Sequence, residues 1–163
     1  MSVTFRRRGE AIRWTLHRQE VVLLRQLVDD LAAAIHGPRE DAVTARLFPP
    51  AVLGDAAADA EVRDLIGDAL LADRVAALEE VVALLDRGRL LRGRLVADLV
   101  DDEPLRLLTV LNDVRLAIGA RIDVEAIDRE RVGEDDEVAV PLAVMDHLGW
   151  WQEQLLALLD GEG

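Results

Sequence analysis

The chain has 163 residues, of which 51% are hydrophobic and 31% charged, and its formal net charge is −13. This length fits one domain, and the composition is that of a globular chain rather than a disordered one. The chain contains no Cys, Lys or Tyr, and its one Ser is Ser2. Thiol and lysine nucleophiles and Cys-based metal sites are therefore excluded. We expect a non-enzymatic protein that needs no cofactor.

The N-terminal residues lack the apolar segment of a secretory signal, and no apolar run is long enough to cross a bilayer. We therefore expect a cytoplasmic protein with no membrane contact. Residues 1–18 and residues 87–94 each carry a local charge of +4, although the chain as a whole is acidic. Such a body repels phosphate backbones, so direct binding of nucleic acid is not expected. The two basic segments are either solvated strands and loops or parts of one local patch.

The first predicted element is a β-hairpin over residues 3–16. Apolar and polar residues alternate there with period two, and Gly9-Glu10 in the middle suits a turn. Because an isolated hairpin is only marginally stable, we expect Phe5 and Trp14 to pack on a helical core.

Helical periodicity covers most of the remaining chain. It predicts helices over residues 18–36, 41–47, 59–87, 104–121 and 141–159. The predicted core stripe of the third helix is Leu71, Val75, Leu78, Val82 and Leu85. Gly67 is expected to kink or divide that helix, and residues 89–99 are expected to form one short strand.

The helix over residues 104–121 is apolar nearly all round, which is typical of a central, buried helix. The predicted fold is therefore mainly α (α+β). It is a single domain over residues 1–163, in which a helical body (18–160) of about five helices surrounds the central helix and carries the small N-terminal hairpin.

Polar residues of the central helix form the first candidate site. At about 100° per residue, Asn112, Arg115 and Gly119 share one stripe, whereas Asp113 points elsewhere. A buried donor needs a partner, so we predict that Arg115 pairs with an Asp or Glu of another helix and that Gly119 admits a close backbone. One interpretation is a structural polar network. The alternative is a small-molecule or anion site, in a binding domain or an enzyme, which requires a cleft beside the stripe.

Trp150-Trp151 forms a second candidate site. Adjacent helical residues point about 100° apart, so one Trp is expected to enter the core and the other to lie at the rim, where it could anchor a protein interface. The alternative is that both tryptophans pack largely within the monomer. Arg6 and Arg8 of the hairpin offer another candidate partner surface, and a homodimer is compatible with both. His147 has no second ligand at i+4, so no metal site is expected.

Several segments together resemble one known family. The run Leu111–Arg121 reads L-N-D-V-R-L-A-I-G-A-R and is similar to the L-N-D-x-R-L-x-L-G-x-R core of an actinobacterial family. The other matching segments are the arginine-bearing hairpin, Glu20 before a Leu/Val helix, Leu47-Phe48-Pro49, and Leu148-Gly149-Trp150-Trp151-Gln152-Glu153. The family has been catalogued as a domain of unknown function, and its members are labelled AosR-like oxidative-stress transcriptional regulators.

The resemblance implies a cytoplasmic regulator of transcription under redox stress. It implies action through a protein partner, a sigma factor or RNA polymerase, rather than through a DNA-reading motif. A chain without Cys cannot switch by forming a disulfide. We therefore expect a protein-binding regulator without cysteine redox sensing, and keep as the alternative a ligand-binding domain centred on Asn112 and Arg115.

Overall fold

The computed structural model describes residues 4–36 and 56–161, and for residues 56–68 it describes the backbone only. The regular elements are β1 (Phe5–Arg8), β2 (Ala11–Leu16), α1 (Arg18–Ile35), α3 (Ala56–Arg87), β3 (Arg89–Leu91), β4 (Arg94–Leu99), α4 (Glu103–Arg121) and α5 (Ala139–Leu159). Two short 3-10 helices, η1 (Val124–Ala126) and η2 (Arg129–Arg131), connect α4 to α5. The fold is α+β and mostly helical. The predicted helix over 41–47 lies outside the described residues, within which four α-helices are found.

The N-terminal hairpin is confirmed, although Val3 lies outside the described residues. β1 and β2 are antiparallel with Phe5 opposite Trp14, and the turn between them contains Gly9 at a φ of 63°. The two aromatic rings stack with their centroids 6.0 Å apart, and both side chains are buried. The hairpin therefore packs on the core, as its marginal intrinsic stability requires.

Residues 89–99 form a second hairpin, so the prediction of one short strand is wrong. β3 and β4 are antiparallel and joined by a two-residue turn in which Arg92 has a φ of 52° and Gly93 a φ of 79°. Two successive positive φ angles are typical of the type I′ turn, which usually carries Asn or Asp before Gly. An Arg at that position conceals the turn in the sequence. The hairpin completes a four-stranded sheet in the order β1-β2-β4-β3.

α3 runs without interruption from Ala56 to Arg87. Of the two effects predicted for Gly67, a kink or a division of the helix, the division is therefore wrong. The buried stripe of α3 also differs from the predicted one. Three of the five predicted core residues, Leu71, Val75 and Val82, are only half-buried. Among the described side chains of α3 (69–87), the buried ones are Ala77, Leu78, Val81, Leu84 and Leu85. α1 also buries one apolar stripe, at Leu24, Val28, Leu31 and Ile35.

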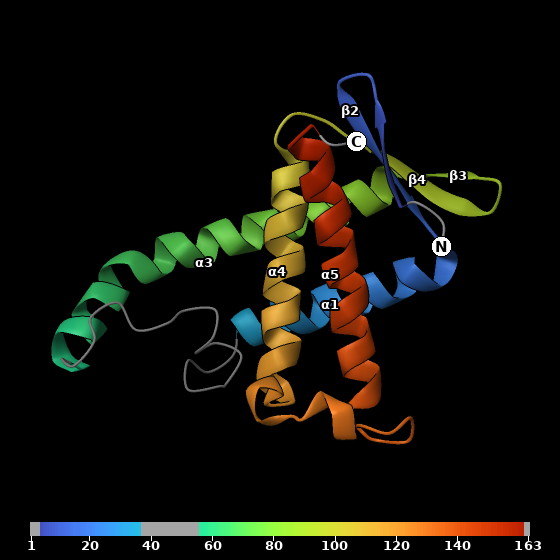
Figure 1. Cartoon of the computed structure of the whole chain (residues 1–163). Helices are drawn as coiled ribbons and strands as arrows, with labels where there is room; N and C mark the ends of the chain where they lie inside the picture. Colours follow the sequence, from blue (N-terminus) through green and yellow to red (C-terminus); the bar gives the residue numbers. More distant parts are fainter. Residues whose placement is uncertain (1–3, 37–55, 162–163) are drawn as a thin grey trace.

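α4 is the central helix. Figure 1 shows it side by side with α5, with both crossing α3 and α1 and the sheet lying at one end of the helices. α4 is not buried all round, since Leu105 is 58% exposed and Asn112 is exposed as well. The core continues from α5 into the sheet, because Trp151 meets Trp14 edge-on with the ring centroids 5.9 Å apart. No helix in the described ranges is both long enough and apolar enough to cross a membrane.

Candidate functional site

The outer face of the sheet gathers arginines from all four strands. Opposite residues of an antiparallel pair share a face, and the register pairs Arg6 with Arg13, Arg13 with Asp98, and Leu91 with Arg94. We call the following set the arginine face: Arg6, Arg8, Arg13, Arg89 and Arg94, with Asp98 among them. The five cations and one carboxylate give a net charge of +4. Arginines from both basic segments of the sequence therefore meet in one patch.

Asp98 is the carboxylate around which the arginine face is arranged. Arg13 donates to it through two hydrogen bonds, Nε to Oδ1 at 2.8 Å and Nη2 to Oδ2 at 3.0 Å, and Arg89 Nη2 lies 4.0 Å from Oδ2. The hydrogen bond from Arg13 lowers the pKa of Asp98 below its ordinary value, and the charges of Arg13, Arg89 and Arg8 add to that shift against a smaller opposing effect of burial. Asp98, on β4, thus interacts with arginines of both neighbouring strands, β2 and β3.

The two edges of the sheet differ. At the β1 edge, α5 supplies partners: the Gln154 Oε1 accepts from the Thr4 N–H at 3.1 Å, and Arg7 donates to the Leu158 carbonyl. The β3 edge carries no further strand in the described part of the chain. Leu90 there is 80% exposed, and the β3–β4 hairpin projects beyond the helices (Figure 1). Such an edge can accept an additional strand.

The predicted partner of Arg115 is wrong. No carboxylate in the described residues pairs with it; instead its Nη1 donates to the amide Oε1 of Gln152 on α5, at 2.8 Å. The Nε of Arg115 is buried and has no hydrogen-bond partner among the described residues. Helix α5 presents an amide where an acid was expected, so the guanidinium has no counter-charge among the residues that the structure describes.

The buried carboxylate of the central helix belongs to Asp113, which is 4% exposed. Asp113 faces α3, where it forms an ion pair with Arg74. The two neighbouring polar residues of α4 therefore enter different interfaces. Asp113 contacts α3 with its charge balanced, and Arg115 contacts α5 without a counter-charge.

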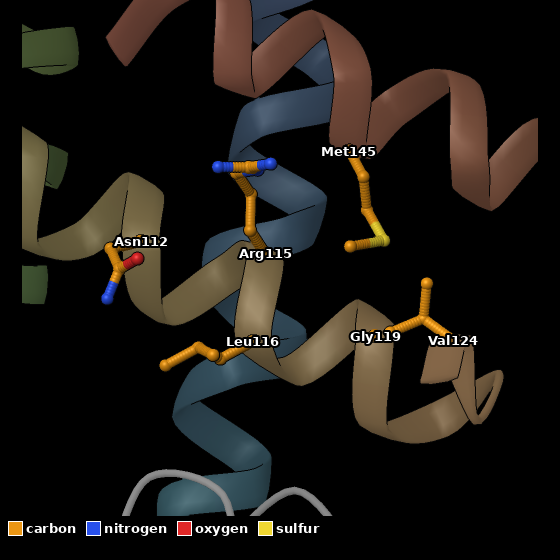
Figure 2. A pocket seen from close by; sticks show the side chains of 6 residues that line it. All are labelled: Asn112, Arg115, Leu116, Gly119, Val124 and Met145. Carbon is orange, nitrogen blue, oxygen red and sulfur yellow. The ribbon is translucent and has the colours of Figure 1, made fainter. Parts of the chain in front are cut away.

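A cavity of about 170 Å³ lies beside the Asn112–Arg115 stripe. Figure 2 shows Arg115 extending from α4 towards α5, with Met145 and Val124 on one side of it and Asn112 on the other. The residues lining the cavity are Asn112, Arg115, Leu116, Gly119, Val124 and Met145. The cleft required by the ligand-binding alternative is therefore present.

Gly119 lines the cavity, but the prediction that it admits a backbone is wrong. A Cβ at Gly119 would lie 3.1 Å from Val124 Cγ1 and 3.4 Å from Met145 Cε, so side chains occupy the space. Close packing against a helical glycine occurs at Gly149 as well, where the neighbour is again a side chain and not a backbone. A Cβ there would lie 3.2 Å from both Cζ and Nη2 of Arg115, so the guanidinium lies against the glycine backbone. A glycine inside a helix lowers its stability, so its presence often indicates close packing. This signal at Gly149 was not among the predictions from the sequence.

The two tryptophans separate as predicted. Trp151 is 1% exposed and belongs to the core, so its side chain offers no surface for direct contact with a partner. Trp150 is half-buried beside His147, with ring centroids 5.8 Å apart. His147 Nε2 lies 2.9 Å from Glu20 Oε1, so this His has a protein partner. Within the described ranges, no group of three His, Asp or Glu side chains could hold a metal ion.

Comparison with known proteins yields one match. A family model described as a domain of unknown function (DUF2017) matches residues 2–159, which is nearly the whole chain. No curated protein and no solved structure shows significant similarity to the chain.

Proposed function

We propose that this chain, which belongs to the DUF2017 family, is a non-enzymatic regulator that binds another protein through its arginine face. The observation that carries the proposal is the concentration of five arginines on one side of a sheet in a chain whose net charge is −13. With +4 on this face, the rest of the chain carries −17. A field of this asymmetry orients an acidic partner towards the sheet and away from the rest of the surface.

The partner that this face fits best is an extended acidic segment of a protein. Guanidinium groups bind carboxylates through two parallel hydrogen bonds, as Arg13 and Asp98 do within the face. A nucleic acid backbone would meet the acidic remainder of the molecule, and the accompanying repulsion disfavours it. The open β3 edge adds backbone donors and acceptors, and Leu90 and Leu91 add exposed apolar contacts. An added strand with alternating acidic and apolar residues would satisfy both features.

The family resemblance directs the search for this partner to transcription. Regulators labelled AosR-like act under oxidative stress, and the resemblance points to a sigma factor or RNA polymerase as the protein bound. Trp150 is a second candidate contact, since its side chain is half-buried at the surface of α5. A chain with no Cys has no thiol with which to form a disulfide, so binding is expected to be independent of oxidant.

The test is a pull-down of tagged protein from its native cytoplasm, with and without oxidant, read by mass spectrometry. The wild type is compared with the double variant Arg89→Glu/Arg94→Glu and with a control of equal charge change, Arg18→Glu/Arg131→Glu, at exposed positions outside the face. We expect RNA polymerase or a sigma factor with the wild type and the control, and at least a tenfold loss, about 1.4 kcal/mol, with the face variant.

Equal recovery of the transcription proteins by both variants would show that the arginine face is not the docking surface. Recovery of no transcription component would overturn the regulator function itself. The other outcome is that a second copy of the chain binds the arginine face, because the acidic body of that copy also complements it. Sedimentation equilibrium at low and high salt distinguishes this outcome, since a homodimer held in this way dissociates as salt rises.

A further inference from the structure

Arg115, at the interface of α4 and α5, has no counter-charge within residues 4–36 and 56–161. Arg115 donates from Nη1 to the neutral amide of Gln152, and its buried Nε–H has no acceptor within the described part of the chain. Buried donors in native proteins are nearly always paired, and an exception calls for an acceptor such as a bound ion. The chain has 32 acidic residues, so the absence of a carboxylate at this position is a feature of the site and not of the composition.

The side chain of Arg115 is held in place by the protein itself. Gln152 fixes one terminal nitrogen at 2.8 Å, and the backbone of Gly149 leaves room for the flat guanidinium, which an added Cβ would contact at 3.2 Å. Both positions are on α5. A preorganised guanidinium loses little conformational entropy when it binds an anion.

The cavity beside this guanidinium is mostly apolar. Its volume is about 170 Å³, and Leu116, Val124 and Met145 line it together with the Cα of Gly119 (Figure 2). Asn112, an exposed residue, is the other polar side chain of the lining. The site thus combines one cation with a half-open, largely apolar hollow that has room for a ligand of only a few heavy atoms.

We propose that this cavity binds a small monocarboxylic acid. The carboxylate would accept hydrogen bonds from the terminal N–H groups of Arg115 that Gln152 leaves free, and a short aliphatic tail would lie against Met145, Val124 and Leu116. A carboxylate matches the planar fork of a guanidinium. A single arginine in a chain of net charge −13 favours a monoanion over a doubly charged phosphate. This site lies between α4 and α5 and is independent of the arginine face, so either proposal can fail alone.

The test follows the side-chain Nε–Hε resonance of Arg115 by NMR during titration with sodium butyrate. Sodium chloride at matched ionic strength, butyramide and inorganic phosphate are titrated in parallel. We expect butyrate to shift the resonance in a saturable manner and the other three to leave it in place. Butyramide has nearly the shape of butyrate but no charge, so it isolates the contribution of the carboxylate.

Three variants define the residues involved. Arg115→Met, which keeps the length of the side chain, is expected to weaken butyrate binding about tenfold or more, measured by calorimetry. Gly149→Ala keeps the arginine but displaces its guanidinium, and it should weaken binding several-fold even if Arg115→Met fails to fold. Arg121→Met removes an exposed arginine from the same helix, with a side chain 46% accessible, and should bind as the wild type does.

The proposal is overturned if butyrate gives no saturable shift at tens of millimolar, or if butyramide shifts the resonance equally. It is also overturned if phosphate competes better than butyrate, because the ligand class is then wrong. Unchanged affinity in both Arg115→Met and Gly149→Ala would show that butyrate binds elsewhere.

Discussion

Helix α4 sends two charged side chains into two different interfaces, and only one of them meets an opposite charge. On the α3 side, Asp113 is buried and forms an ion pair with Arg74. On the α5 side, Arg115 meets the amide of Gln152, the backbone of Gly149 and a cavity. Two acids of α5 lie near Gln152 in the sequence. Asp146 pairs with Arg129 at 3.0 Å, and Glu153 is exposed.

Because their pairing differs, Asp113 and Arg115 are suited to different roles. A buried ion pair that is complete within the chain stabilises one helix arrangement and has nothing left to offer a ligand. A guanidinium with a neutral partner and free donors has bonding capacity in reserve. The measurements that follow test whether the α3 side of α4 is structural and the α5 side is not.

The largest effect is expected from Arg74→Ala. This change leaves the carboxylate of Asp113, 6% accessible, without its counter-charge in an apolar interface. Removing one partner of a buried pair is strongly destabilising, and we expect a loss of about 3 kcal/mol in the free energy of unfolding. Urea denaturation measures it. A loss below about 1 kcal/mol would show that water or another residue solvates Asp113 and that the two sides of α4 are alike.

A pH-dependent loss is expected from Asp98→Asn. The pKa of Asp98 is lowered by its hydrogen bond with Arg13 from an ordinary value of 3.8. A lowered folded-state pKa adds stability that is present above the unfolded-state value and is lost as the pH falls through the folded-state value. The variant should therefore be less stable than the wild type at pH 7, and the difference should shrink below about pH 4.

The control for this pH experiment is Glu134→Gln, a change at an exposed residue of the loop between η2 and α5. Urea unfolding at several pH values compares all three proteins. If the difference between Asp98→Asn and the wild type were the same at pH 3 and pH 7, the ion pair on the arginine face would contribute nothing to acid sensitivity.

A much smaller change in stability is expected from Arg115→Met. No carboxylate loses its partner, and the aliphatic part of the side chain is retained, so only the hydrogen bond to Gln152 is removed. Replacing an incompletely paired charge by an apolar side chain of similar volume is often neutral. We expect the free energy of unfolding to stay within about 1 kcal/mol of the wild type. A loss as large as that of Arg74→Ala would make Arg115 a structural residue and remove the contrast.

The smallest effect is expected from Arg25→Ala. Its ion pair with Asp86 joins α1 to α3 at 2.8 Å, but the two side chains are 40% and 61% accessible. Exposed pairs are screened by water and salt, so we expect a change of no more than about 0.5 kcal/mol. Thermal denaturation with replicate measurements resolves this limit. A larger loss would indicate that exposure is a poor guide to the strength of ion pairs in this protein.

Most of the fold could be predicted from local patterns. Period-two alternation identified the first hairpin, and helical periodicity identified four α-helices of the described chain, because burial of one face leaves a trace in the order of residues. Local patterns failed where the trace was weak. The Arg92-Gly93 turn lacks the usual Asn or Asp. Gly67 did not divide α3, because a single Gly within a long helix costs only about 1 kcal/mol.

The candidate sites were predicted only in part. The helical stripe of Asn112 and Arg115 was identified correctly as lining one face, and the separation of Trp150 from Trp151 followed from adjacent positions on a helix. The partner of Arg115 was not predicted correctly. The periodicity of α4 does not indicate which residue of α5 lies opposite Arg115, and the chain offers 32 acidic candidates. Gly149 was the one local signal that pointed to close packing there.

Composition and periodicity are properties of the chain alone, so the excluded nucleophiles, the approximate positions of the helices and the charge of each segment follow from the order of residues. Which charges meet depends on the tertiary structure. The pairing of β2 with β4 sets Arg13 opposite Asp98, 85 residues away, and so assembles the arginine face from two distant segments. The packing of α4 on α5 leaves Arg115 with an amide and a cavity. Both outcomes depend on register between elements that no local pattern records.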